Sequence, residues 1–257
     1  MDRGMESGGT DIIWTQFILA AALTRVARQA AGQDGEDEEA IRFSYADTHA
    51  GGGRLPTPAA LPAVLARRGE FISRAWLDAV AAGGHHPGSW VLAGRVIGAL
   101  GGLDFEADVN DIDPAVMEGA KGRREGGWVR FWSHDWFSFL RHRFVLEPRP
   151  HFVFIDPPPD DPRGPGYAID AAILLDTLDT PYMVAYPVDA SSQDAIDQIG
   201  RSGLELRGPG LERGVLLGGG AETVVLDILS DLRLLAWLLG GELSVRLPRA
   251  PADDYCI

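Results

Sequence analysis

Acidic residues stand at the ends of four short apolar stretches of the sequence. These acids are Asp47, then Asp111 or Asp113, then Asp135, and finally Asp156. A single acid in such a place is most often a turn residue or a helix N-cap. Four of them on successive strands favour one shared site, because ligands of open parallel sheets bind beyond the carboxyl ends of the strands.

The fourth stretch, HFVFID, is followed at once by three prolines, Pro157–Pro159. Proline donates no backbone hydrogen bond, so a central strand must end there, and the carbonyl groups remain free. The Asp156 carboxylate and the Pro157 carbonyl together offer two acceptors for one amino group. Holding both N–H bonds of a ring-conjugated amine would aim its lone pair at a methyl carbon, and such positioning can supply roughly 7–11 kcal/mol. Asp156 and Pro157 are therefore the catalytic candidates.

The residues around the other strand ends suit an adenosine-containing cofactor. Asp111 is the best candidate to accept hydrogen bonds from two ribose hydroxyls, and Asp135 could accept from the exocyclic amine of an adenine. The glycine-rich turn THAGGGR (Thr48–Arg54) lacks the G-x-G-x-x-G spacing of dinucleotide sites. S-adenosylmethionine therefore fits better than NAD, and a glycine turn without any ligand stays open as an alternative.

Metal ions are not indicated by the sequence. The segment Asp108–Asp113 begins like an EF-hand loop, but its sixth position is not glycine and its twelfth, Gly119, is not glutamate. The pair His85 and His86 has no third ligand nearby. The single cysteine, Cys256, excludes a disulfide within the chain and a cysteine zinc cluster.

Four segments resemble, in this order, the RlmJ family of 23S ribosomal RNA adenine-N6 methyltransferases. They are YADTHAGGGR (Tyr45–Arg54), HPGSWVLAGRV (His86–Val96), FIDPPPD (Phe154–Asp160) and AYPV (Ala185–Val188). The D-P-P triplet after a fourth strand is the hallmark of methyltransferases that act on amino groups of adenine or cytosine. The resemblance, which covers about residues 8–239, implies a class I methyltransferase fold, S-adenosylmethionine as cofactor and large-subunit ribosomal RNA as partner.

The resemblance also implies roles for individual residues. His49 and Ser89 would line the cofactor. Asp111 would hold the ribose, where the family has a glutamate, and Asp135 would hold the adenine. Asp156 would accept hydrogen bonds from the target amine.

Several positions depart from the family pattern. The N-terminal motif has become SGGTDIIWTQ (Ser7–Gln16), so that Gln16 stands where the family holds its cofactor, and Trp136 replaces a small residue beside the adenine. Pro159 replaces an aromatic residue whose stacking on a base is worth about 1–3 kcal/mol. LDIL (Leu226–Leu229) replaces a second N-P-P-W motif. Two alternatives stay open: a degenerate homologue that binds without transfer, and a methyltransferase for a small amine or a protein side chain.

Strands alternate with helical patterns along the chain, as in βαβ units. We expect one α/β domain over residues 1–257, with a Rossmann-like, mostly parallel sheet of seven strands and helices on both faces. Residues 55–88, with four prolines, are expected to form a small helical insertion. Strands are expected at 41–47, 104–114, 128–135, 151–156, 181–188, 204–208 and 222–228, and helices at 11–31, 89–100, from 114, 166–180, 191–202 and 232–239.

Composition narrows the possible partners. The chain has 23 basic and 37 acidic residues, a net charge of −14, which argues against a sequence-independent grip on phosphate backbones. A local arginine patch could still bind RNA. The apolar run Ile12–Leu23 is short and lacks a basic segment before it, so we expect a buried helix rather than a signal peptide or a membrane span. We expect a cytoplasmic monomer.

Overall fold

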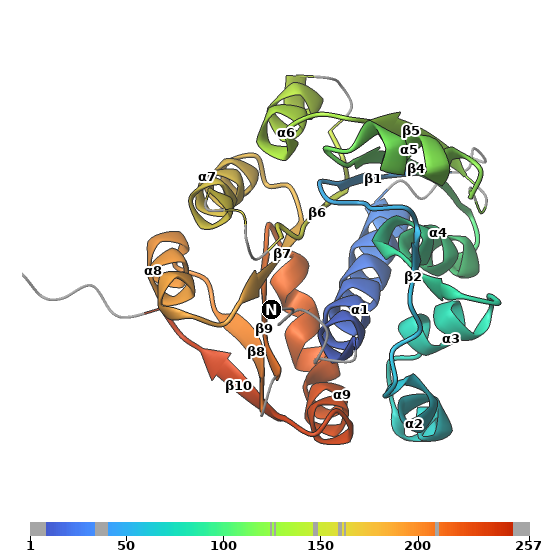
Figure 1. The fold of residues 1–257 in the computed structure, drawn as a ribbon, viewed down its shortest axis with the longest axis vertical. Coiled ribbons are helices and arrows are strands. Elements are labelled where there is room, and N and C mark those ends of the chain that lie inside the picture. The colour runs from blue at the N-terminus through green and yellow to red at the C-terminus, as the bar shows by residue number, and fades with distance from the viewer. Residues whose placement is uncertain are drawn as a thin grey trace, which may run out of the picture.

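The computed structural model describes residues 9–33, 41–123, 125, 127–145, 149–158, 161, 163–208 and 211–248. Its centre is a sheet of eight strands (Figure 1). These strands are β1 (Ile41–Asp47), β4 (Leu103–Asn110), β5 (Trp128–Trp132), β6 (Phe152–Ile155), β7 (Tyr182–Pro187), β8 (Gly203–Gly208), β9 (Leu211–Gly218) and β10 (Glu242–Arg246).

The strands lie in the order β10-β8-β9-β7-β6-β1-β4-β5. The five strands from β5 to β7 pair in parallel, whereas β9 is antiparallel to both β7 and β8, and β10 is antiparallel to β8. The predicted Rossmann-like α/β fold is confirmed. The sheet differs from the prediction in having eight strands rather than seven, and its last three strands add antiparallel pairs.

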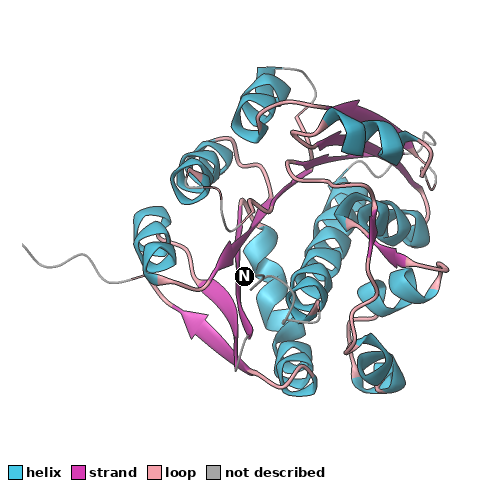
Figure 2. Ribbon diagram, in the orientation of Figure 1, coloured by secondary structure: helices cyan, strands magenta, loops and turns pink. Residues whose placement is uncertain are grey.

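Helices cover both faces of this sheet, as predicted (Figure 2). Side chains of β6 alternate between two cores: Phe152 and Phe154 belong to one, Val153 and Ile155 to the other. The first core packs against α1 (Thr10–Gln33), α4 (Ser89–Leu100), α5 (Pro114–Lys121) and α9 (Val225–Leu238). The second packs against α6 (Trp136–Val145), α7 (Gly164–Thr177) and α8 (Ala190–Ile199).

Helix α1 contains the apolar run that was expected to be buried. Its residues from Ile13 to Leu23 are buried in the first core. In the described part of the chain, no helix is both long enough and apolar enough to cross a membrane.

Residues 54–87 fold into a small unit beside α1 and α9. It contains a two-stranded ladder, β2 (Arg54–Leu55) with β3 (His86–Pro87), the helices α2 (Leu61–Ala66) and α3 (Ala75–Ala81), and a 3-10 turn, η1 (Arg68–Glu70). The buried carboxylate of Asp231 on α9 accepts hydrogen bonds from the backbone N–H groups of Ile72 and Ser73, at 3.0 and 2.7 Å. This contact ties the unit to the main body.

The C-terminal part of the sheet corrects one prediction. The segment ETVVLDI is not a strand: Ala221–Val224 forms a 3-10 turn, η2, which leads into α9. Buried residues recur at helical spacing along this segment: Val224, Ile228, Leu232 and Leu235. This burial pattern outweighs the strand preference of two adjacent valines. The strand in this region is β9, and both β10 and α6 lie where the sequence had predicted no element.

Helix α6 is held to the sheet by a buried carboxylate. Asp108 on β4 accepts hydrogen bonds from Nε of Arg130 and Nε of Arg143, both at 2.6 Å, and from Nε1 of Trp132 at 2.9 Å. The Asp108 and Arg143 side chains are each only 3% exposed. The network fixes α6, and therefore the residues at its N-terminus.

We expect Asp108→Asn to lower the free energy of unfolding by about 3–5 kcal/mol, because the buried Arg143 guanidinium would lose its counter-charge. Urea unfolding followed by circular dichroism measures this change. Asp104→Asn, on the exposed part of the same strand, is the matched control and should stay within about 0.5 kcal/mol of the wild type. Equal stability of the two variants would show that the network does not hold α6.

Candidate active site at the switch point of the sheet

Strand order reverses between β1 and β6. From β1 the chain continues to β4 and β5 on one side, and it then crosses to β6 and β7 on the other. In open α/β sheets, the crevice outside such a switch point is where ligands bind. The loop after β1 is fastened here, since Thr48 donates from its backbone N–H and from its hydroxyl to the Phe154 carbonyl, at 3.1 and 3.2 Å.

Asn110, at the end of β4, joins the loops that follow three strands. Its Nδ2 donates to the carbonyl oxygens of Thr48 and His134, at 3.2 and 3.0 Å, and its Oδ1 accepts from the His134 backbone N–H at 3.0 Å. The residue is fully buried. The sequence analysis missed this residue, although a polar amide at the end of an apolar strand was a signal for it.

His49 lies where the predicted acids converge. Its Nδ1 is 2.7 Å from Thr48 Oγ1, its ring lies 5.3 Å from that of Trp136, and its buried Nε2 has no hydrogen-bond partner among the described residues. Burial lowers the pKa of His49 to about 4, against the opposing charges of Asp156, Asp111, Asp161 and Asp135. Asp111, Asp135 and Asp156 follow β4, β5 and β6, which are parallel strands of one sheet, so these acids come at the same edge of the sheet as His49.

Asp47 is the structural anchor of the β1 end. Its carboxylate is fully buried and accepts hydrogen bonds from Ser89 Oγ at 2.5 Å, Tyr45 Oη at 3.0 Å and the His49 backbone N–H at 3.1 Å. Burial raises the pKa of Asp47 to about 7, although these hydrogen bonds act in the opposite direction. The hydroxyl of Ser89, a predicted cofactor contact, is thus directed at Asp47.

Asp111 and Asp135 both have local structural roles. Asp111 Oδ1 accepts from the Asp113 backbone N–H at 2.9 Å in a turn. Asp135 caps α6 through the Ser138 backbone N–H at 3.1 Å, and its Oδ2 lies 3.4 Å from Arg163 Nη2. The next residue, Trp136, is buried against His49. The pair with Arg163 is long and exposed, so opening it for a ligand would cost little.

Asp156 has an unexpected partner. Its Oδ1 accepts a hydrogen bond from Arg213 Nη2 in an ion pair. Arg213 lies on β9, in register with Pro187 at the end of β7, so its side chain reaches across that strand end to β6. The sequence analysis did not single out Arg213. Pro159, the position of the missing aromatic residue, lies outside the described residues.

Two other predicted features contribute to packing. Gln16 is buried in α1; its Nε2 donates to the Pro87 carbonyl at 2.7 Å, and its Oε1 accepts from Trp76 Nε1 at 3.3 Å. Its predicted contact with a cofactor remains a prediction. In the glycine turn, Gly53 has a φ of +78°, and a Cβ there would come within 2.5 Å of the Trp90 ring. This glycine therefore serves a close approach within the protein.

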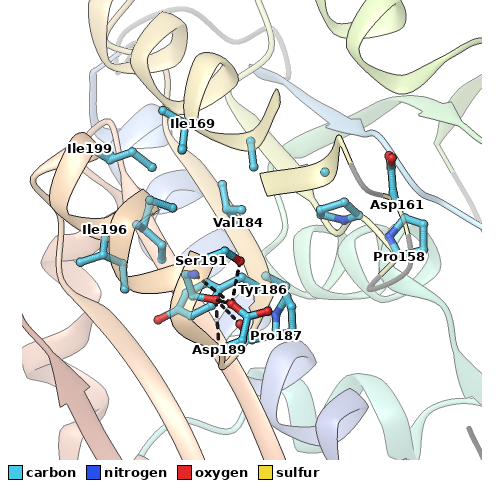
Figure 3. A pocket seen from close by; sticks show the side chains of 17 residues that line it. Pro158, Asp161, Ile169, Val184, Tyr186, Pro187, Asp189, Ser191, Ile196 and Ile199 are labelled. Carbon is cyan, nitrogen blue, oxygen red and sulfur yellow. Dashed lines mark hydrogen bonds between the residues drawn. The ribbon is translucent and has the colours of Figure 1, made fainter. Parts of the chain in front are cut away.

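An apolar cavity of about 80 Å³ lies between α7 and α8 (Figure 3). Pro157 and Pro158 form part of its wall, so it begins next to Asp156. It lies on the β6–β7 side of the switch point, away from Asp111 and Asp135 on the β4–β5 side. Across the described ranges, no three histidine, cysteine, aspartate or glutamate side chains are grouped to hold a metal ion.

The fold and the site define a Rossmann-like α/β protein in which carboxylates follow the strands on both sides of the switch point. No protein-family model matches the chain, and no curated protein matches it. Among solved structures it is similar to protein LPL1258 from Legionella pneumophila, of family-model DUF519, with a TM-score of 0.65 and 16% identity over 93% of this chain and 98% of that one. At this identity the likeness establishes the fold alone.

A second similar structure is a Listeria monocytogenes protein described as a candidate class I S-adenosylmethionine-dependent methyltransferase. It has a TM-score of 0.43 and 11% identity, and the match covers 85% of this chain and 70% of that one. This likeness is too low to carry an argument about function, which therefore depends on the site itself.

The low pKa of His49 makes stability depend on pH. The folded pKa of about 4 lies below the ordinary value of 6.5, so the neutral imidazole stabilises the fold above pH 6.5, and this contribution is lost as the pH falls toward 4. Between pH 7 and 4.5, the wild type should lose about 2–3 kcal/mol more unfolding free energy than His49→Gln. Urea unfolding at both pH values measures the difference.

His86 is the matched internal control for this comparison. Burial also lowers its pKa to about 4, and it is present in both proteins, so its contribution cancels. If the wild type and His49→Gln lose equal stability over this range, His49 is not held neutral in the folded protein.

Proposed function

We propose that the protein is an S-adenosylmethionine-dependent methyltransferase that acts on an amino group, with adenine N6 of large-subunit ribosomal RNA as the acceptor. The observation that carries the proposal is that Asp111, Asp135 and Asp156 follow parallel strands on the two sides of the switch point, with the loop of His49 between them. The first two acids follow the strands on the cofactor side of such a sheet. Asp156 and its proline follow the strand on the other side, where an acceptor would approach.

The residues present fit the cofactor. Asp111 uses Oδ1 in its turn, and its Oδ2 has no hydrogen-bond partner among the described residues, so it could accept from ribose hydroxyls. Asp135 could accept from the adenine amine once Arg163 moves aside. The unpartnered Nε2 of His49 points to a missing polar group at this position. When bound, S-adenosylmethionine supplies a methyl group activated by its sulfonium.

The acceptor amine would be oriented by the protein backbone and one carboxylate. Asp156 Oδ2 and the Pro157 carbonyl have no hydrogen-bond partner among the described residues, and they can each take one N–H of a –NH₂ group. Fixing both N–H bonds leaves the nitrogen lone pair as the exposed nucleophile. A positioning effect of this kind is a large part of what an enzyme can contribute to a two-substrate reaction.

One observation favours a second candidate, a methyltransferase-like binding protein without transfer activity. The Asp156–Arg213 ion pair already occupies part of the carboxylate that should hold the amine. In a protein that has lost catalysis, such a pair would simply stabilise the end of the sheet. Cofactor binding without methyl transfer is the outcome that this candidate predicts.

The test is transfer of a labelled methyl group from S-adenosylmethionine to deproteinised large-subunit RNA. We expect incorporation at adenine N6, and we expect Asp156→Ala to lower the rate at least a hundredfold, because about 3 kcal/mol of positioning is lost. Calorimetry provides the control: Asp156→Ala should bind the cofactor like the wild type, whereas Asp111→Ala should bind it at least tenfold more weakly.

Transfer by the wild type at the level of Asp156→Ala would contradict the proposed activity. If the wild type nevertheless binds the cofactor, the second candidate is supported. Transfer to another amine but not to RNA would retain the methyltransferase and contradict the adenine acceptor.

A further inference from the structure

Arg213 approaches the proposed reaction centre as a largely buried cation. Its side chain is 13% exposed, whereas that of Asp156 is 32% exposed. The two residues lie at the ends of β9 and β6, with the end of β7 between them. Asp156 is therefore held from one side by the guanidinium and stays open to solvent on the other.

The ion pair makes the two carboxylate oxygens of Asp156 different from each other. Oδ1 is committed to Arg213, and neither Oδ2 nor the carbonyl of the next residue, Pro157, has a hydrogen-bond partner among the described residues. These two acceptors match a neutral amino group, which has two N–H bonds and a lone pair to spare. An ammonium group has no lone pair, and the nearby Arg213 charge would oppose it.

The cavity beside Pro157 provides room for the body of the acceptor. Its volume of about 80 Å³ is roughly half the 150 Å³ of an apolar cavity that holds benzene, so it limits the acceptor to one small ring that enters in part. In Figure 3, Ile169, Ile196 and Ile199 gather at one end, and Pro158 and Asp161 stand at the other. The walls are mainly apolar and favour an uncharged ring. The two lining acids are already engaged, because Asp189 accepts from the Ser192 backbone N–H and Asp161 from the Arg163 backbone N–H.

We propose that Arg213 is a positioning residue and that the Asp156–Arg213 pair and this cavity together select a neutral amino group carried on a compact flat ring. The inference rests on the proposed function and adds Arg213 as the residue that determines which kind of amine is accepted. Arg213 commits one oxygen of Asp156, keeps the other aimed at the acceptor and excludes cationic amines.

The first test compares two amines of nearly equal size by ligand-observed NMR at pH 7.5, with S-adenosylhomocysteine and the full chain. Aniline is neutral under these conditions, and cyclohexylamine is cationic. The wild type should bind aniline at least tenfold more tightly. Arg213→Gln should reduce this preference at least fivefold, and Arg213→Lys should retain most of it.

Arg42→Gln is the matched control, because Arg42 lies near the start of β1, at the opposite edge of the sheet, and forms a long, largely exposed ion pair with Glu106 at 3.7 Å. It should keep the wild-type preference. Equal preference in the wild type and a folded Arg213→Gln would overturn the proposal. If Arg213→Gln does not fold, Asp156→Asn replaces it: it should lose aniline binding, and unchanged binding would equally overturn the proposal.

The second test fills the cavity from α8. Ala195 lines the cavity and is half-buried, so Ala195→Leu should weaken aniline binding at least tenfold. Gln198→Leu adds the same side chain on the exposed side of the helix and should leave binding unchanged. Wild-type binding by Ala195→Leu would overturn the assignment of the cavity to the acceptor ring.

Two further measurements distinguish a free ring from RNA as the ligand, and they test the inference separately from the proposed function. Binding of 9-methyladenine that depends on Arg213 supports the proposal with a free ring as the source. The same dependence seen only with an adenine-containing oligoribonucleotide supports it with RNA as the source. These binding measurements do not require methyl transfer. If the protein binds selectively but transfers no methyl group, only the proposed function is contradicted. If it transfers methyl groups normally but binds without selectivity, only this inference is contradicted.

Discussion

The parallel pairing of β1 with β6 is the constraint on which the rest of the structure depends. Tyr45, Ala46 and Asp47 lie in register with Phe152, Val153 and Phe154, and Thr48 then bonds twice to the Phe154 carbonyl. This register places His49 beside the carboxylates that follow the neighbouring strands. A shift of the β1–β6 register by one residue would turn every side chain of β6 to the opposite face of the sheet. Both hydrophobic cores and the site would then be disrupted.

Much of this arrangement could be predicted from the sequence, because the signals were local. The bounds of β1 and α4 were predicted as the structure has them: Asp47 and a glycine run end the strand, and Gly88 precedes the helix. The expectation that Asp111, Asp135 and Asp156 follow strands at one carboxyl edge came from the rule for parallel sheets, and the strand order agrees with it. Helix α6 could not be predicted in the same way, since its anchor is the buried contact of Arg143 with Asp108, 35 residues away.

Arg213 also could not be predicted from the sequence, because its partner is distant in the chain. It lies 57 positions from Asp156 in the chain, and only the order of β9, β7 and β6 brings the two together. The expectation about partners that rests on net charge stays a prediction, and several of the acids counted in it are buried. Asp108 is paired with two arginines, and Glu205 with Arg207 and Arg246. A net charge of −14 therefore describes the whole chain rather than the field at any one place on its surface.

We infer that S-adenosylmethionine binds at the switch point, with its reactive end between the two halves of the sheet. A crystal structure of the protein with S-adenosylhomocysteine tests it most directly. The account predicts the ribose at Asp111, the adenine at Asp135, and the sulfur on the side of His49 that faces Asp156. A ligand bound elsewhere, or a crevice into which none binds at saturating concentration, would contradict it.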